Sequence, residues 1–576
     1  MQEKIRQAIK SAVRKLYPEH KDIDFNVDYA PENTGADLAS NVALVLGKKL
    51  GRKPMEVAKR LREAIPDSIG ALGLDFRLRG NDIQIEIAPP GFLNFTISDE
   101  YLENNLLDIV REGDDYGSSE KKNKQKVLVE YFQPNIVKSL HVGHMRSAII
   151  GDCLYRVNKL FARKVESDTH MGDWGTQFGI LLCAYKKWGD EKIVSKDPIT
   201  ELNKLYVRIN NEIEKNPKLR EEGKAEFVRL EQGDKENRKL WKKFVDWSME
   251  RFLQINDLLD VMPFDHHWPE SFYEDKMSAV VERLKKEKLL KPSEGAQIVD
   301  LTSYNLGTAM IVKSDGGTTY LLRDLSTYLY RKNEGFDRQL YVVDNRQAHA
   351  FKQLFKIMEL LGEWKEGDAE HISFGFMSLP EGTLSTRKGN IIELEEVVAK
   401  AKEKAQKIMA QKNPGLVGAG AVSRDVAIGA LKYFDLSHNR NTDLVFSWEK
   451  ALDFEGNSGP YIQYTHARIQ SILRKAKEST RIKNSVYDNP EEKKLLRLLV
   501  RFPETVQVVF ETSLPNHLAD YLFELCSAFN NYYQKIRILQ EEDADRRLSR
   551  LMLASGVAQV IRNGLWLLGI TAPEEM

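Results

Sequence analysis

The sequence predicts an α/β protein built around a doubly wound parallel sheet, with a small α+β unit before it and an all-helical region after it. The first observation is the run VLVEY (127–131), which is apolar except for Glu130 and is typical of a strand buried on both faces. The second is the alternation of strand and helix patterns that follows, as in LYVVD (340–344) before HAFKQLFKIMELLG (349–362). The third is the almost continuous helical pattern from about residue 396 onward.

The region before the core contains helical stripes at 4–16 and 36–65 and an alternating strand, DIQIEIA (82–88), that leads through a turn into a second extended segment. A polar stretch then indicates a linker. The predicted parts are an N-terminal unit (1–112), a linker (113–126), the core (127–395, with a helical insertion at about 190–260), a helical connector (396–456) and a C-terminal helical domain (457–576).

Composition limits the class of protein. The 576 residues suggest three or four domains of about 100–200 residues each. Lys+Arg and Asp+Glu both number 85, so a nucleic-acid partner must be met by a local basic face. The three cysteines are far apart and form no CxxC, which disfavours disulfides and a thiolate zinc site and predicts a cytoplasmic location. No apolar run approaches the ~18 residues of a membrane span, so no membrane partner is expected.

The strand at 127–131 leads into HVGH (141–144), where His141 and His144 stand three residues apart before a helical pattern. A metal site, a phosphate site and plain packing are the competing interpretations. Metal is disfavoured because the spacing differs from HExxH and no acid or cysteine cluster is nearby in sequence. Phosphate is favoured because two imidazoles and the amides of a helix N-terminus converge there, and Gly143 would let adenine approach the backbone.

PNIVKSLHVGH (134–144) resembles the HIGH motif of class I aminoacyl-tRNA synthetases, and its leading PN and its lysine are similar to the arginyl family in particular. Other blocks resemble that family in the same order. They are YAPENTGADLASNVALVLGKKLGRKP (29–54), PPGFLNF (89–95), THMGDWGTQFGILL (169–182), KSDGGTTYLLRDLSTYLYR (313–331), LYVVDNRQAHAFKQLF (340–355), FMSLPEGTLSTRKGNIIELEEVV (376–398) and FEGNSGPYIQYTHARIQSILRKA (454–476). The resemblance covers nearly the whole chain.

The resemblance implies a Rossmann-like, HIGH-type core between an N-terminal tRNA-contacting domain and a helical anticodon-binding domain. It implies that ATP and L-arginine form arginyl-adenylate and that arginine is then transferred to the 3′ end of tRNA(Arg). Mg2+ would accompany ATP, and no tightly bound metal is expected. A monomer, and activation of arginine only with tRNA bound, are further expectations.

The resemblance also implies the residues of the nucleotide site. His141, His144 and Lys138 would be catalytic. The ATP-binding set would be Pro134, Gly143, His144, Gly172, Asp173, Trp174, Gln177, Ser385, Thr386, Arg387 and Lys388. The family's second signature, KMSKS, is matched here by TLSTR (383–387), with threonine at both lysine positions. Lys138 is therefore the expected substitute, assisted by Arg387 or Lys388, and a solvated surface lysine is the alternative.

Arginine recognition needs a carboxylate, because a planar guanidinium pairs best with a bidentate acid. Tyr320 and Asp324 are four apart and would share one helix face. By resemblance, Asp324 takes the guanidinium; a surface ion pair with Arg323 is the alternative. The full arginine-binding set implied is Glu130, Asn135, Tyr320, Asp324 and Gln347.

The C-terminal helices carry aromatic and basic residues of the kind that hold unstacked anticodon bases. The candidates are Tyr461, Tyr464, His466, Arg468, Asn530 and Tyr533, some of which must instead pack the bundle. Two other functions stay open. Another HIGH-type nucleotidyl transferase is disfavoured by the arginine-binding set, and a non-catalytic tRNA-binding relative is disfavoured because His141, Gly143 and His144 are all present.

Overall fold

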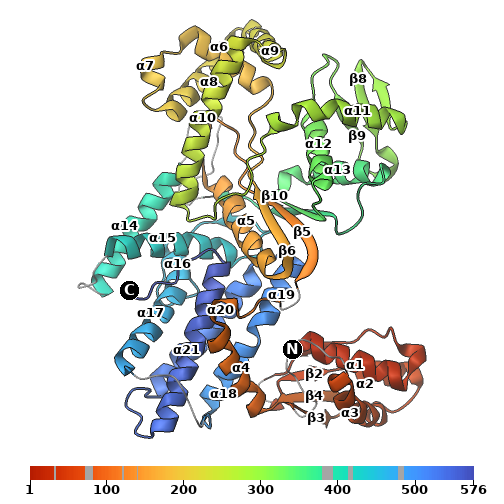
Figure 1. Cartoon of the computed structure of the whole chain (residues 1–576), viewed down its shortest axis with the longest axis vertical. Coiled ribbons are helices and arrows are strands. Elements are labelled where there is room, and N and C mark those ends of the chain that lie inside the picture. The colour runs from red at the N-terminus through yellow and green to blue at the C-terminus, as the bar shows by residue number, and fades with distance from the viewer. Residues whose placement is uncertain are drawn as a thin grey trace.

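A computed structural model describes residues 1–31, 34–71, 82–119, 122–138, 140–378, 393–412, 419–477 and 485–576. Figure 1 shows an elongated molecule with the parallel sheet near its middle. The N-terminal unit and the C-terminal helices lie at one end, and the helices α6–α10 and the β7–β9 unit lie at the other.

The N-terminal unit packs three helices on a four-stranded antiparallel sheet of order β1-β2-β4-β3. Its elements are α1 (Gln2–Leu16), β1 (Val27–Tyr29), β2 (Leu38–Ser40), α2 (Val42–Leu50), α3 (Pro54–Ala71), β3 (Ile83–Ala88) and β4 (Phe92–Ile97). The stripe at 4–16 forms α1 and buries Ile5, Ile9 and Val13 in a core separate from that of the rest of the chain. The segment 36–65 is not wholly helical as expected. It opens with β2, which is too short to show a periodicity and exists because it pairs with β4.

The core sheet has four parallel strands in the order β11-β10-β5-β6, which confirms the predicted fold class. The strands are β5 (Asn123–Glu130), β6 (Ala162–Asp168), β10 (Arg338–Asp344) and β11 (Ala369–Phe374). Helix α5 (Val142–Phe161) connects β5 to β6, and α13 (Ala348–Leu360) connects β10 to β11. The last residues of β5 and β6, Glu130 and Asp168, are register partners, so the two acids end neighbouring strands.

The structure differs from the prediction between the N-terminal unit and the core. Helix α4 (Asp99–Glu112) buries Leu102, Leu106 and Ile109 in the core shared with the C-terminal helices. The contact is close, because a Cβ on Gly556 would lie 2.2 Å from Leu106 Cδ1. The end of the predicted linker is also ordered, since β5 already begins at Asn123.

Helices fill the region of the predicted insertion. They are α7 (Glu191–Val194), α8 (Pro198–Lys215), α9 (Lys218–Glu231) and α10 (Lys235–Leu258), and α6 (Thr176–Trp188) precedes them. Of the aromatic residues at helical spacing on α10, Phe244 and Phe252 are buried, whereas Trp241 and Trp247 are half-buried. The sequence did not predict the antiparallel unit that follows. It consists of α11 (Met277–Lys286), β7 (Leu290–Ser293), β8 (Ala296–Asp300) and β9 (Thr308–Val312).

The rest of the chain is mainly helical. It contains β12 (Met377–Ser378), α14 (Leu394–Lys412), α15 (Ala419–Leu436), β13 (Leu444–Val445), α16 (Trp448–Ala451), α17 (Gly459–Ala476), α18 (Pro490–Val500), α19 (Phe502–Thr512), α20 (Asn516–Lys535) and α21 (Ala544–Leu567). Helix α4 packs on α18 and α21. No helix in the described part of the chain combines the length and apolar character needed to cross a membrane.

Gly151 sets the distance between α5 and Tyr131, the residue that follows β5. A Cβ at this position would lie 2.2 Å from Tyr131 Cβ. Adding a methyl group to a packed core costs about 1–3 kcal/mol, so we expect Gly151→Ala to lower the urea midpoint of unfolding. The matched control is Gly420→Ala in α15, because nothing lies within 4 Å of a Cβ there. An equal midpoint for both variants would contradict this account of α5.

Candidate active site

The segment between β5 and α5 crosses the carboxyl ends of the parallel strands, where open α/β sheets bind ligands. Two of its residues, Phe132 (φ 56°) and Val137 (φ 66°), have left-handed backbone conformations. Such conformations cost about 1–2 kcal/mol and persist only where the surroundings enforce them. Here Ile136 N donates to Gly172 O (3.0 Å) and Gly172 N donates to Pro134 O (3.1 Å). The segment is therefore fastened to the loop after β6.

Three of the predicted site residues meet at this junction. Asn135 and Gly172 form an isolated parallel bridge, and a Cβ on Gly172 would lie 2.1 Å from Asn135 Oδ1. Gln177, in the first turn of α6, donates to the same oxygen over 3.5 Å. Glycine is required at 172 because any side chain would displace the asparagine. Pro134 is buried beside them.

His141 and His144 begin helix α5 and cap it reciprocally. His141 is the N-cap residue; Gly143 N donates to its Nδ1 (3.1 Å), and His141 N donates to His144 Nδ1 (3.2 Å). The two ring centroids are 4.1 Å apart. Because each Nδ1 accepts a backbone hydrogen bond, each neutral ring carries its proton on Nε2. Neither Nε2 has a hydrogen-bond partner among the described residues, so both are donors open to a ligand.

Both rings are neutral at physiological pH. Burial, with the positive charges of Arg346 and Lys138, lowers the pKa of His141 to about 4. Burial, with His141 and Lys138, also holds the pKa of His144 well below its ordinary value. The pair therefore offers two fixed N–H dipoles, a preorganised arrangement suited to oxygen atoms that gain negative charge.

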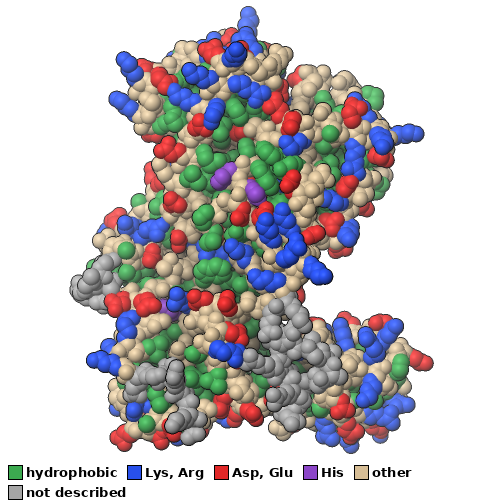
Figure 2. Space-filling view, viewed as in Figure 1, with side chains coloured by type: hydrophobic (Ala, Val, Ile, Leu, Met, Phe, Trp, Pro, Cys, Tyr) green, Lys and Arg blue, Asp and Glu red, His purple; other side chains and the backbone are tan. Residues whose placement is uncertain are grey.

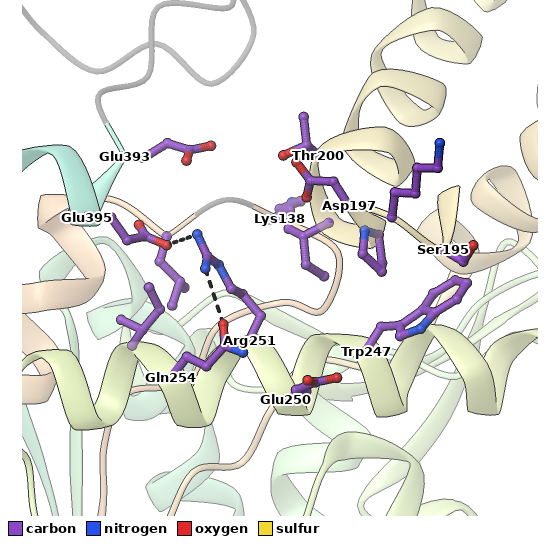
Figure 3. Close-up of a pocket in the computed structure, with 15 residues that line it drawn as sticks. Lys138, Ser195, Asp197, Thr200, Trp247, Glu250, Arg251, Gln254, Glu393 and Glu395 are labelled. Atoms are coloured by element: carbon purple, nitrogen blue, oxygen red, sulfur yellow. Dashed lines mark hydrogen bonds and ion pairs between the residues drawn. The ribbon is translucent and has the colours of Figure 1, made fainter. Parts of the chain in front are cut away.

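Lys138 is exposed, and no described residue forms an ion pair with it. It borders a cavity of about 530 Å³ between the segment before α5, the start of α8 and helix α10. Figure 3 shows Lys138 across this cavity from Trp247 on α10, with Glu393 and the Arg251–Glu395 ion pair to one side. On the face seen in Figure 2, histidine side chains reach the surface in the recess between the two upper units, and Lys and Arg side chains gather below them.

The acids at the strand ends share one buried cation that sequence reasoning missed. Arg331, on α12 (Tyr320–Asn333), has a side chain that is 0% exposed. Its Nη1 forms an ion pair with Glu130, and its Nη2 lies 2.5 Å from Asp168 Oδ2. Gln133 Nε2 also donates to Glu130 Oε1 (3.1 Å). Burial would raise the pKa of Glu130, but Arg331 and the neighbouring dipoles hold it below its ordinary value, so Glu130 is ionised.

Glu130, Asp168 and His170 form the group with the spacing of potential metal ligands, their nearest ligand atoms lying within 4.8 Å of one another. The guanidinium of Arg331 already stands between the two carboxylates. Arg331 follows Asp324 by seven residues, or two helical turns, so the shared helix face was the available signal for finding it.

Asp324 is half-buried and forms no hydrogen bond or ion pair with any residue in the described ranges. Burial, reinforced by the charge of Glu130 and opposed by Arg323 and Arg331, raises its pKa to about 7. Its neighbour Arg323 pairs with Glu270 instead (3.1 Å), which removes the surface ion pair as an explanation of Asp324. A half-buried acid with a raised pKa and no partner among the described residues is a candidate site for a cationic ligand.

Tyr320 lies one turn before Asp324, and its side chain is 58% exposed with the Arg323 guanidinium 4.5 Å from its ring. Gln347 is exposed in the 3-10 turn that follows β10. Both are therefore accessible near the ends of the strands. The predicted ATP-binding residues Ser385, Thr386, Arg387 and Lys388 lie outside the described residues.

Asp173 and Trp174 face the protein. Asp173 accepts from Ser271 N (2.8 Å) and Oγ (2.6 Å), and burial raises its pKa to about 6. Trp174 is 0% exposed, and its ring packs edge-on against Trp241 and Phe227. In this structure these two residues join the site to the insertion and present no surface to a nucleotide.

The predicted anticodon residues divide into two groups. His466 is buried with Nδ1 2.9 Å from Pro573 O, and Asn530 is buried and donates to the hydroxyl of Tyr461 (3.0 Å), so these three have internal partners. Tyr464, Arg468 and Tyr533 form the other group, named here the Arg468 cluster; it is linked to the first group because Arg468 Nη1 donates to Asn530 Oδ1 (2.6 Å). The Arg468 guanidinium lies 4.8 Å from the Tyr464 ring and 5.9 Å from the Tyr533 ring, and Tyr533 is 39% exposed.

Comparisons with known proteins agree with this geometry. The family "tRNA synthetases class I (R), catalytic domain" matches residues 105–448, the "Arginyl tRNA synthetase N terminal domain" matches 3–97, and the "DALR anticodon binding domain" matches 462–576. The arginine–tRNA ligase of Clostridioides difficile is 37% identical over 577 residues, which is 99% of each chain. The chain belongs to the class I arginyl-tRNA synthetase family.

Other members of the family support the same assignment. The arginine–tRNA ligase of Enterococcus faecalis is 40% identical over 538 residues, or 93% of this chain and 92% of the relative. The solved arginyl-tRNA synthetase of Thermus thermophilus covers 100% of both chains with a TM-score of 0.82 at 25% identity. The resemblance inferred from the motifs is thus confirmed at the level of the family and the fold.

Proposed function

We propose that this protein is an arginine–tRNA ligase, which converts ATP and L-arginine to arginyl-adenylate and diphosphate and transfers arginine to tRNA(Arg). The observation that carries the proposal is Asp324, an acid that has no partner among the described residues and lies beside the ionised Glu130. It lies at the same sheet edge as two imidazole Nε2–H donors. That combination suits a ligand with a guanidinium next to a ligand with phosphates.

In the first step, the arginine carboxylate attacks the α-phosphate of ATP and diphosphate leaves. Such phosphoryl chemistry depends mainly on positioning and on stabilising charge. His141 and His144 donate from Nε2 to phosphate oxygens, and their neutral state keeps them from trapping the product by full ionic pairing. Mg2+ enters with ATP as part of the substrate. The ammonium of Lys138, which pairs with no residue in the described part of the chain, approaches the leaving diphosphate, in place of the lysines missing from TLSTR (383–387).

The arginine substrate is held at both of its cationic ends. Its guanidinium pairs with Asp324 and donates hydrogen bonds to the Tyr320 hydroxyl oxygen and the Gln347 amide oxygen. Its α-ammonium binds Glu130, with Asn135 oriented by the bridge to Gly172. A site built of such polar partners disfavours substrate analogues that lack the matching hydrogen-bonding groups by about 10⁴–10⁵-fold.

Arginine binding should depend on pH through Asp324. In the empty site its pKa is raised to about 7, so the acid is protonated below that pH and must lose its proton to pair with a guanidinium. We expect the KM for arginine to rise about tenfold for each unit that the pH falls below 7 and to level off above about 8. Aminoacylation kinetics from pH 5.5 to 8.5 check this, and the Asp324→Asn variant should lose the dependence.

The Arg468 cluster supports an anticodon contact on the C-terminal helices. Stacking of a base on an aromatic ring contributes about 1–3 kcal/mol, so we expect Tyr533→Ala to raise the KM for tRNA by about 5–100-fold with kcat little changed. The matched control is Tyr304→Ala, which removes a similarly exposed tyrosine (43%) from the β7–β9 unit. Equal KM values for the two variants would remove Tyr533 from the contact.

The test of the proposed function is aminoacylation of total tRNA with each labelled amino acid in turn. We expect charging with arginine alone. Charging with a different amino acid would favour another HIGH-type transferase, and tRNA binding without adenylate formation would favour a non-catalytic relative. A monomer in the cytoplasm is part of the proposal; three buried free cysteines support a reducing compartment.

A further inference from the structure

Arg331 is the cation around which the strand-end acids are arranged. Its side chain is 0% exposed, and its two terminal nitrogens pair with acids at the ends of two different strands. The guanidinium also lies over the ring of Tyr341, 5.5 Å from the ring centroid. Glu130 and Asp168 each contribute one carboxylate oxygen to it. The second oxygen of Asp168 accepts from Trp268 N (2.8 Å), which fixes that acid in place.

The charges near the strand ends explain why such a cation is needed. Three acids, Glu130, Asp168 and Asp324, converge there, and like charges oppose one another's ionisation. Arg331 forms ion pairs with Glu130 and Asp168 and none with Asp324. Glu130 is thereby kept ionised and oriented, whereas Asp324 is left without a cationic partner among the described residues.

We propose that Arg331 is a positioning residue for amino-acid recognition: it holds the Glu130 carboxylate in place for the α-ammonium of the substrate and leaves Asp324 alone for the side-chain guanidinium. The inference rests on the proposed function. It predicts that the two ends of arginine depend on different parts of the site. Arg331 acts mainly on the end that carries the α-ammonium, because it contacts Glu130 directly and reaches Asp324 only through a small electrostatic effect. Arg331 does not contact the substrate itself; it acts on the substrate by positioning Glu130.

The test compares two ligands that differ only at that end. L-Arginine and 5-guanidinopentanoic acid, which lacks the α-amino group, are titrated into the wild-type protein and into Arg331→Met and Arg331→Lys by calorimetry. We expect Arg331→Met to weaken arginine binding by about 10–100-fold, as for a lost charge-assisted contact, and to change the affinity of the analogue less than threefold. Arg331→Lys should restore part of the loss, because it keeps the charge without the two-pronged geometry.

A buried arginine also supports the fold, so the ratio of the two affinities is the decisive readout. Equal weakening of both ligands, or unchanged arginine binding, would overturn the inference. If Arg331→Met does not fold, Gln133→Leu provides a second route, because it removes the 3.1 Å bond to the other Glu130 oxygen and should also weaken arginine selectively. Failure of the wild type to bind or charge arginine would instead refute the proposed function, which separates the two outcomes.

Discussion

Replacing Asp324 by asparagine should raise the KM for arginine by about 10²–10³-fold and leave the KM for ATP within about twofold. The substitution keeps the shape of the side chain but removes the charge that pairs with the guanidinium. Losing one partner of a buried, hydrogen-bonded charge pair costs about 2–5 kcal/mol. Because Asp324 has no bond to any described residue, little of this loss should come from damage to the fold.

Aminoacylation at saturating tRNA, with arginine and ATP varied separately, measures this effect. The matched control is Asp246→Asn on α10, which removes an exposed acid whose ion pair among the described residues is with Lys242 at the surface. Its kinetic constants should stay at wild-type values. An unchanged KM for arginine in Asp324→Asn would exclude this residue from the binding site.

The second large effect is expected at His144. We predict that His144→Gln lowers kcat by about 10²–10³-fold, the usual loss for one preorganised donor to a developing charge, with both KM values little changed. Glutamine is chosen because, at the third position of a helix, it can still accept from the N-cap backbone N–H as a capping box requires. The helix should therefore keep its start while the site loses the Nε2–H donor.

Single-turnover adenylate formation, measured beside the thermal midpoint, distinguishes chemistry from stability. His517→Gln, at an exposed position in α20, is the matched control and should leave both quantities unchanged. A fall in kcat of less than about threefold for His144→Gln, with an unchanged midpoint, would contradict a role in phosphate stabilisation. Because the pKa values of both histidines are low, we also expect no loss of the adenylation rate through histidine protonation between pH 6 and 8.

Local patterns were sufficient to predict the nucleotide end of the site. The first four residues of VLVEY form the buried end of β5, and HVGH forms the capped start of α5. Both features could be predicted because each depends on consecutive residues. The roles of Asp173 and Trp174 are less evident from the motif. The structure turns both inward to Ser271 and Trp241, partners about 70–100 residues away along the chain.

Long-range ionic contacts were not predictable from patterns. Arg331 reaches Glu130 across 201 positions and Asp168 across 163, and a lone arginine in an amphipathic helix is usually solvated. The association of α4 with α18 and α21 was missed for the same reason, since an apolar stripe on a helix does not identify its partner. Strands β7–β9 have four or five residues each and half-exposed faces, which gives too short a pattern to read.

A structure of the full chain with L-arginine and a non-hydrolysable ATP analogue tests the central claim most directly. The account predicts that the guanidinium lies within about 3.2 Å of the Asp324 carboxylate and that phosphate oxygens lie within the same distance of Nε2 of His141 and His144. A guanidinium bound elsewhere while Asp324 faces only water, or a triphosphate that avoids both imidazoles, would contradict it.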